Sequence, residues 1–201
     1  MTDTPPFAVT YDYRCPFARN AHEHVIAGLR AGAPWDVTFL PFSLGQMHVA
    51  EGAPPVWEDP AAGPTLLPAL ASLVVRDHHP TKFLDLHEAL FAARHDDGRD
   101  LRDPAVLADV VTNVGLDDDE VLRAAGDPEV TAQFREIHET AERDHKVFGV
   151  PTFVTGDAAV FVRLQHRPQG DAAEATRSIE RIIELISWPD LNEFKWTSIR
   201  R

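Results

Sequence analysis

The stretch Tyr11-Asp12-Tyr13-Arg14-Cys15-Pro16-Phe17-Ala18 decides how this sequence folds, and it contains the only cysteine among 201 residues. The apolar run Phe7-Ala8-Val9-Thr10-Tyr11 leads into it and is typical of a strand, while apolar residues at helical spacing follow it. Pro16 suits the first turn of a helix, because its fixed φ fits there and its missing N–H would have no helical partner. The sequence therefore predicts that Cys15 lies where a strand ends and a helix begins.

A thiol at the start of a helix is expected to be an accessible, reactive nucleophile. It faces unpaired backbone N–H groups and the positive end of the helix dipole, and both favour the thiolate. Half-ionising a thiol of pKa about 8.5 at pH 7 needs roughly 2 kcal/mol, whereas one helix dipole supplies roughly 0.3–1 kcal/mol. Further N–H contacts, or the charges of Arg14 and Arg19, are therefore expected to help Cys15 ionise. The alternative is a buried, inert cysteine.

The first part of the chain predicts a βαβ unit over residues 7–42. Its first helix should end near Gly32-Ala33-Pro34, and residues 35–42 alternate in part between apolar and polar, as a second strand does. Such a unit usually forms a parallel strand pair with a right-handed crossover. The segment from Gly45 to Pro64 is rich in Pro, Gly and Ala and predicts a long loop.

The middle of the chain, residues 66–148, has helical spacing of apolar residues throughout. Three aspartates in it predict helix N-caps: Asp103, Asp117 and Asp127. Strands are then predicted at residues 152–155 and 159–164, around a hairpin turn at Gly156-Asp157, and a helix at about 172–186. The fold class is therefore α/β, in the order βαβ, helical block, ββα.

The sequence Gly149-Val150-Pro151-Thr152-Phe153 lies where the helical block meets a strand. Proline is acceptable at the first residue of a strand but not in its interior. A cis Val150–Pro151 bond costs only about 0.5–1 kcal/mol, against roughly 2.5–4 kcal/mol for a residue other than proline. A cis bond here would turn backbone polar groups toward a ligand, but Val-Pro-Thr alone is weak evidence for it, since most X-Pro bonds are trans.

These two motifs, with a helical insertion between them and a hairpin after them, resemble the DsbA-like branch of the thioredoxin superfamily. That branch includes the 2-hydroxychromene-2-carboxylate isomerases and the kappa-class glutathione transferases. Weaker features make the chain most similar to actinobacterial mycothiol-dependent reductases: Phe42-Ser43-Leu44, Arg167-Pro168-Gln169-Gly170 and Trp188-Pro189-Asp190-Leu191-Asn192-Glu193-Phe194-Lys195. The resemblance covers nearly the whole chain. It implies a thioredoxin-like domain at residues 1–60 and 145–201, with an all-helical insertion domain at 61–144.

The resemblance also implies roles for individual residues. Cys15 matches the attacking cysteine. Pro151 matches the cis-proline beside it, and Val150 presents its backbone to the substrate. Ala18 stands where dithiol members carry the second, resolving cysteine. Without that second thiol, Cys15 cannot close an internal disulfide. The residues expected to contact a bound thiol or substrate are Arg14, Pro16, Phe17, Arg19, Val150 and Pro151.

Three functions are compatible with these motifs. The first is a monothiol thiol–disulfide oxidoreductase, in which Cys15 forms a mixed disulfide that a low-molecular-weight thiol such as mycothiol or glutathione resolves. The second is a thiol-dependent transferase or isomerase of the kappa type, in which Cys15 only orients a bound thiol. The third is a non-catalytic binding protein with the same fold. The expected partners are a small thiol and a small or disulfide substrate, with a homodimer as a further possibility and no tightly bound cofactor.

Composition narrows the remaining possibilities. The formal net charge of -13 argues against nucleic acid and anionic membranes as partners. No signal-peptide pattern is visible at the N-terminus, and no apolar run approaches the roughly 20 residues of a membrane span. A single cysteine fits a reducing compartment, so a cytoplasmic protein is expected. The pairs His138/His145 and His78-His79 do not match a zinc signature, and no metal site is expected.

Overall fold

The computed structural model describes residues 4–193 and begins with the predicted βαβ unit. This unit consists of β1 (Phe7–Tyr11), α1 (Pro16–Arg30) and β2 (Val37–Pro41). The two strands are parallel, and Val9 of β1 lies opposite Phe39 of β2. Pro16 is the first residue of α1, as its lack of an N–H favours.

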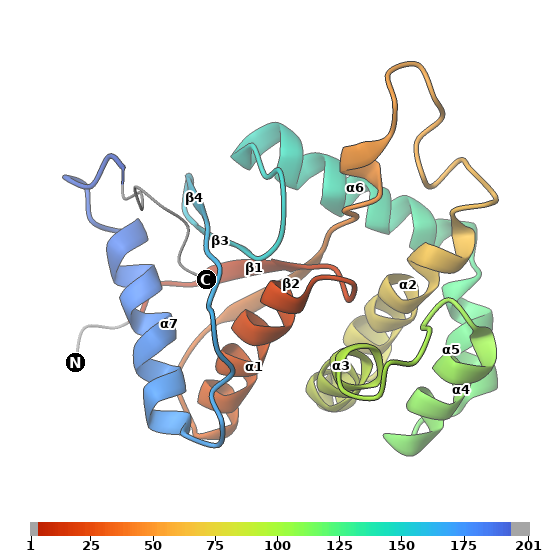
Figure 1. Cartoon of the computed structure of the whole chain (residues 1–201), viewed down its shortest axis with the longest axis horizontal. Helices are drawn as coiled ribbons and strands as arrows, with labels where there is room; N and C mark the ends of the chain where they lie inside the picture. The colour runs from red at the N-terminus through yellow and green to blue at the C-terminus, as the bar shows by residue number, and fades with distance from the viewer. Residues whose placement is uncertain (1–3, 194–201) are drawn as a thin grey trace.

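A block of helices follows, drawn in orange to teal in Figure 1. It comprises the short 3₁₀ helix η1 (Gln46–His48), α2 (Gly63–His78), α3 (Pro80–His95), α4 (Pro104–Asn113), α5 (Asp118–Ala125) and α6 (Pro128–His145). The predicted N-caps of α4, α5 and α6 are confirmed: Asp103, Asp117 and Asp127 each accept a backbone N–H hydrogen bond of 2.9 Å. Helices α2 to α5 gather at the end of the molecule opposite the C-terminal helix (Figure 1).

The last unit, β3 (Thr152–Thr155), β4 (Ala158–Phe161) and α7 (Ala172–Ile186), returns the chain to the sheet. The strand order is β2-β1-β3-β4, and β3 runs antiparallel to both of its neighbours. Strand β1 is therefore central, and its side chains Phe7, Val9 and Tyr11 are buried. Helices α1 and α7 pack against each other beside the sheet.

The fourth strand is shorter than predicted, ending at Phe161 rather than at residue 164. Its partner β3 begins directly after Pro151, and the N–H of Val162 makes the last bond, 3.1 Å, to the carbonyl oxygen of Pro151. Beyond this point the chain leaves the sheet. The side-chain amide of Asn20 in α1 then donates to the carbonyl oxygen of Leu164 at 2.9 Å.

The second strand is also shorter than predicted, because Trp35 belongs to the turn before it. The N–H of Trp35 bonds to the carbonyl oxygen of Ala33 at 2.8 Å, and its ring covers α1 at Gly28. A Cβ atom at Gly28 would lie 2.3 Å from that ring, so only glycine permits this close contact.

The α/β class and the insertion of helices between two parts of one sheet are confirmed. The domain limits at residues 60 and 145 stay a prediction. Of the C-terminal segment used for the resemblance, Phe194 and Lys195 lie outside the described residues. Within residues 4–193, no helix has both the length and the apolar character needed to cross a bilayer.

Candidate active site

Cys15 is the N-cap residue of α1, and its thiol connects the two sequence motifs. The sulfur accepts a hydrogen bond from the N–H of Ala18 at 3.4 Å and donates one to the carbonyl oxygen of Val150 at 3.4 Å. The Val150–Pro151 peptide bond is cis, and both residues are buried. Residues separated by 135 positions in the sequence thus meet at one sulfur atom.

The thiol is less accessible than the sequence suggested, since Cys15 is only 9% exposed. Burial raises the pKa of Cys15, and the N–H groups of Ala18 and Phe17 lower it by less than burial raises it. The charge of Asp12 raises this pKa further, and the charge of Arg163 lowers it. Cys15 is therefore less accessible than expected, and its thiol donates a hydrogen bond to Val150. Its role as a reactive nucleophile stays a prediction.

The two arginines expected to activate the thiol form ion pairs with other residues. Arg14 binds Asp12, with Nη2 2.7 Å from Oδ2. Arg19 is buried in α1, where its Nε donates to Glu23 at 2.9 Å, and it also pairs with Asp96 after α3. The expected contribution of Arg14 and Arg19 to the ionisation of Cys15 is therefore not found. The arginine whose charge lowers the pKa of Cys15 is Arg163.

Asp12, which was not singled out from the sequence, organises the turn before Cys15. Its carboxylate accepts the N–H of Arg14 at 2.9 Å and the N–H of Leu44 at 2.9 Å, and its carbonyl oxygen accepts the N–H of Cys15 at 2.9 Å. The segment after β2 is thereby joined to the active-site turn. The Asp-x-Arg spacing is a local signal of such a turn and could have been recognised.

Behind the thiol, a chain of buried hydrogen bonds crosses from α3 to β1. The Tyr13 hydroxyl lies 2.7 Å from His87 Nδ1, His87 Nε2 lies 2.8 Å from His22 Nδ1, and His22 Nε2 lies 3.0 Å from the carbonyl oxygen of Thr10. That carbonyl only accepts, so both imidazoles carry their proton on Nε2 and Tyr13 is the donor to His87. Burial lowers the pKa of His22 to about 4 and that of His87 well below its usual range, which keeps both rings neutral.

Thr10 also fixes the proline segment to β1. Its hydroxyl accepts the N–H of Thr152 at 2.8 Å, and the Thr152 hydroxyl donates to the carbonyl oxygen of Gly149 at 2.8 Å. Both threonines are buried, so these bonds are shielded from water. The backbone on either side of Pro151 is therefore held in one position relative to the end of β1.

Aromatic side chains lie on the surface next to both sequence motifs. Phe148, just before the proline segment, is 65% exposed, and its ring lies 5.3 Å from that of Phe161. The guanidinium carbon Cζ of Arg163 lies 4.9 Å from the ring centroid of Phe17 and 5.9 Å from that of Phe161. Phe17, the predicted contact residue, therefore lies half-buried under an arginine, while Pro16 is exposed.

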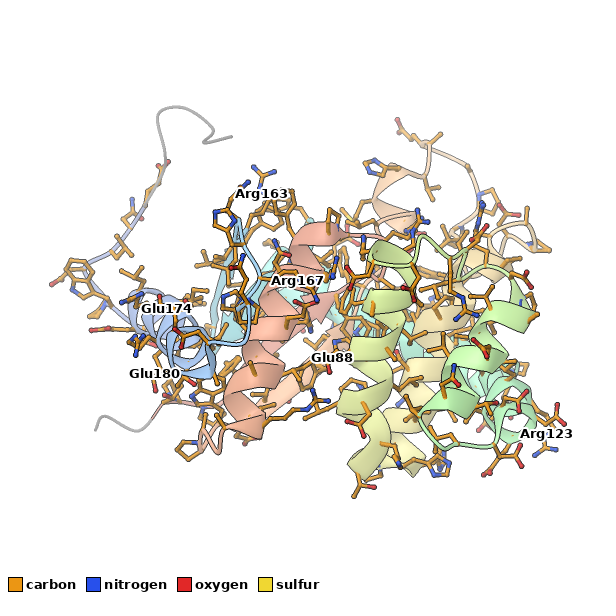
Figure 2. All side chains as sticks on the ribbon, turned by 60° about the horizontal axis from the view of Figure 1, so that its bottom comes forward. Glu88, Arg123, Arg163, Arg167, Glu174 and Glu180 are labelled. Atoms are coloured by element: carbon orange, nitrogen blue, oxygen red, sulfur yellow. The ribbon has the colours of Figure 1, made fainter. Side chains whose placement is uncertain are left out.

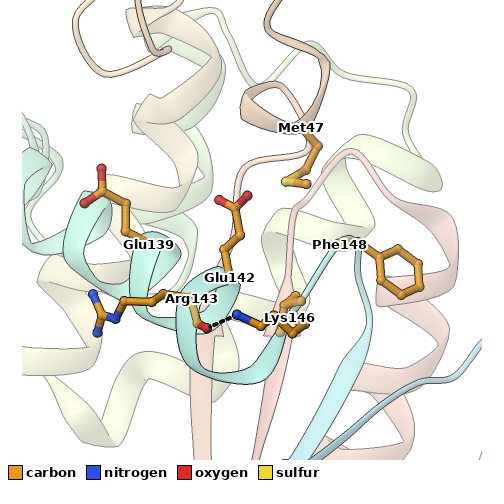
Figure 3. Close-up of a pocket in the computed structure, with 7 residues that line it drawn as sticks. Met47, Glu139, Glu142, Arg143, Lys146 and Phe148 are labelled. Carbon is orange, nitrogen blue, oxygen red and sulfur yellow. Dashed lines mark hydrogen bonds between the residues drawn. The ribbon is translucent and has the colours of Figure 1, made fainter. Parts of the chain in front are cut away.

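Two hollows lie near this region. One, of about 310 Å³, is bounded by Asp12, Tyr13 and Arg14 on one side and by α2 and the segment before α4 on the other. The second, of about 480 Å³, is shown in Figure 3, where Phe148 lies on the opposite side from Glu139 and Arg143. Only the first is lined by residues of the active-site turn, so it is the candidate cavity for a small substrate.

Titratable side chains elsewhere do not form a metal site in the part of the chain that the structure describes. No group of three or more His, Cys, Asp or Glu side chains is placed there to hold an ion. His138 is fully buried, accepts the N–H of Ser43 at 3.2 Å and packs on the ring of Phe42. Its burial lowers its pKa to about 4.

Comparison with known proteins agrees with this geometry. Residues 8–166 match the family described as DSBA-like thioredoxin domain. No curated protein matches the chain. Pseudomonas aeruginosa DsbA is 21% identical, with 92% of this chain and 84% of that chain covered and a TM-score of 0.56. The cytosolic disulfide reductase DsbM from Pseudomonas aeruginosa with GSH is 17% identical, with 89% and 99% covered and a TM-score of 0.61. At these identities the likeness is one of fold.

Proposed function

Because this chain belongs to the DsbA-like thioredoxin domain family, we propose that it is a thiol–disulfide oxidoreductase with a single catalytic cysteine, Cys15. The observation that carries the proposal is the setting of the sulfur, held between the N–H of Ala18 and the carbonyl oxygen of Val150 beside a cis-proline. Ala18 occupies the place of a resolving cysteine and is fully buried. The site therefore has one thiol and no second thiol to displace a bound substrate.

In the proposed reaction, Cys15 loses its proton to solvent and its thiolate attacks one sulfur of a disulfide RSSR. A Cys15–S–S–R bond forms, and RS⁻ leaves and takes up a proton. A second small thiolate, R′S⁻, then attacks the sulfur of R, forming RSSR′ and restoring the Cys15 thiolate. The N–H of Ala18 stabilises that thiolate each time it is formed or released.

We propose a low-molecular-weight thiol, mycothiol or glutathione, as the resolving cosubstrate, without a tightly bound cofactor. One structural neighbour is described as a cytosolic disulfide reductase with GSH, which supports both a small thiol and a cytoplasmic location here. The segments Phe42-Ser43-Leu44 and Arg167-Pro168-Gln169-Gly170 support a place near the isomerases, kappa-class transferases and mycothiol-dependent reductases. The acidic charge supports partners other than nucleic acid and membrane, and a homodimer is part of the same proposal.

A second candidate function is that of a kappa-type transferase or isomerase, and one observation favours it. The Cys15 thiol is 9% exposed and already donates a hydrogen bond to Val150, and burial raises its pKa. A group in that state can orient the sulfur of a bound thiol without reacting with it. In this function Cys15 binds the cosubstrate, and no mixed disulfide forms.

Intact-protein mass spectrometry after exposure to glutathione disulfide and mycothiol disulfide separates these functions. A covalent adduct that is absent from Cys15→Ser supports the oxidoreductase. Saturable binding of the reduced thiol without an adduct supports the transferase. If neither an adduct nor binding is detected, both proposals are contradicted, and the remaining interpretation is a non-catalytic binding protein.

A further inference from the structure

Arg163 lies next to Phe17 of the active-site helix, with its guanidinium over two aromatic rings. Its Cζ atom is 4.9 Å from the ring of Phe17 and 5.9 Å from that of Phe161. A guanidinium stacked on aromatic rings uses its faces for that contact and keeps its N–H edges free to donate hydrogen bonds. This arrangement places N–H hydrogen-bond donors next to Phe17, two residues after Cys15.

The backbone around Arg163 is fixed to both halves of the site. Directly before it, the N–H of Val162 donates to the carbonyl oxygen of Pro151 at 3.1 Å. Directly after it, the amide of Asn20 in α1 donates to the carbonyl oxygen of Leu164 at 2.9 Å. The arginine is therefore held at a set place between the cis-proline and α1.

Arg163 is exposed, and within residues 4–193 it makes no ion pair. The other arginines near the site differ: Arg14 binds Asp12, and Arg19 and Arg167 both bind Glu23. Figure 2 shows Arg163 and Arg167 on the segment between β4 and α7. The charge of Arg163 also lowers the pKa of Cys15, which places it within electrostatic reach of the sulfur.

We propose that Arg163 is a specificity-determining residue that binds the carboxylate of a small acidic disulfide while Cys15 attacks its sulfur. A planar guanidinium with free N–H edges matches a carboxylate, and the charge-assisted hydrogen bonds fix its orientation. A protein of net charge -13 repels anions in general, so an acidic substrate needs a local cation at the site. This inference rests on the proposed oxidoreductase function and names the class of its substrate.

The test compares rates of mixed-disulfide formation for three small disulfides: 3,3′-dithiodipropionate (acidic), 2-hydroxyethyl disulfide (neutral) and cystamine (basic). The variants are Arg163→Gln and the control Arg123→Gln. Arg123 is an exposed arginine of α5 at the opposite end of the molecule (Figure 2), so both variants lose one positive charge. We expect Arg163→Gln to lower the ratio of the acidic to the neutral rate about fivefold, a size typical of one exposed charge-assisted contact. Arg123→Gln should leave the ratio unchanged.

The ratio of two rates isolates binding from nucleophilicity, because a change in the pKa of Cys15 alters both rates alike. An unchanged ratio in Arg163→Gln, with normal adducts in the wild type, overturns the role of Arg163 and leaves the oxidoreductase function standing. An equal fall of the ratio in both variants assigns it to net charge and also overturns the inference. A wild type that forms no adduct with any of the three disulfides overturns both proposals.

Discussion

Ala18 is the residue that limits the chemistry of Cys15. It lies three positions further along α1, on the same helix face, and its N–H is bonded to the sulfur at 3.4 Å. Its methyl group is fully buried and cannot react. In the proposed reaction, a mixed disulfide at Cys15 would therefore persist until an external thiol removes it.

Replacing this alanine tests that limit. We expect Ala18→Cys to form an internal disulfide after oxidation and to gain insulin reductase activity with dithiothreitol as the electron donor. The added sulfur occupies a closed position, so the free energy of unfolding should fall by about 1–3 kcal/mol. The measurements are the turbidity that develops as insulin is reduced, a count of free thiols after oxidation, and urea unfolding.

The matched control for this variant is Ala21→Cys. Ala21 is equally buried in α1 but lies six residues from Cys15, beyond disulfide reach on a regular helix. It should keep two free thiols and stay inactive. Efficient insulin reduction by the wild type, or a folded Ala18→Cys protein that keeps both thiols, contradicts the monothiol interpretation.

The sequence identified those candidate site residues that stand in a recognisable local motif. Cys15 was recognised because the lone cysteine stands before a proline where a strand pattern gives way to a helix pattern. Pro151 was recognised from its place before a strand together with the family resemblance, because Val-Pro-Thr alone is weak evidence. Asp12 and Arg163 act on the thiol only because β1, α1 and the end of β4 come together. That proximity is tertiary, so no periodicity in the chain indicates it.

Among the connecting elements, two turns share one side-chain arrangement but differ in their surroundings. Asp12 binds Arg14 and Asp100 binds Arg102 in the same way, each through a backbone N–H and the guanidinium. Asp12 is buried and also accepts the N–H of Leu44, whereas Asp100 is exposed. The turn at Asp100 is therefore purely local, whereas the turn at Asp12 also joins the segment after β2 to the end of β1.

We therefore expect Asp12→Ala to lower the free energy of unfolding by about 2–3 kcal/mol, because buried donors lose a charged acceptor. Asp100→Ala should leave the free energy of unfolding nearly unchanged, because this exposed ion pair is screened by water. Urea unfolding of both variants measures this difference. Asp12→Ala should also lower the pKa of Cys15, because the carboxylate raises it, and iodoacetamide labelling rates across pH report that shift. Equal losses of stability in the two variants would contradict the cross-linking role of Asp12.

Element types were predictable because caps and spacing are local. The aspartate caps of α4, α5 and α6 and the two-residue hairpin turn at Gly156-Asp157 needed no tertiary information. The start of β2 was predicted two residues too early, at Trp35 rather than Val37, and the end of β4 three residues too late, at residue 164 rather than Phe161. Their true limits depend on Trp35 packing over Gly28 and on Asn20 bonding to Leu164, contacts that arise only in the folded molecule.

For the whole molecule, buried neutral histidines make stability depend on pH. The pKa of His22 and that of His138 are lowered to about 4, and that of His87 lies well below its usual range. Unfolded histidine has a pKa of about 6.5. Between these values only the unfolded state binds the proton, so the free energy of unfolding falls as the pH drops from about 6.5 toward 4. Each such histidine contributes at most roughly 3 kcal/mol to that loss.

Urea unfolding from pH 7.5 to 4.5 checks this dependence, since most carboxylates titrate below that range. Stability should be constant above pH 7 and decline below about 6.5. His138→Gln should reduce the slope of the free energy of unfolding against pH, because one proton fewer is taken up on unfolding. The glutamine side chain retains an acceptor for the N–H of Ser43. Constant stability between pH 7 and pH 5 would show that these imidazoles are not buried as neutral groups.

The joining of Cys15 to Val150 also sets an order of events during synthesis. The two residues are 135 positions apart, and ribosomes add about 5–20 residues per second, so roughly 7–27 s separate their appearance. Throughout that interval the nascent chain lacks β3, the strand that pairs with β1 and follows the carbonyl acceptor of the thiol. The cysteine is therefore accessible to cellular oxidants and small disulfides before Val150 and β3 are made to cover it. The speed of translation sets how long that exposure lasts.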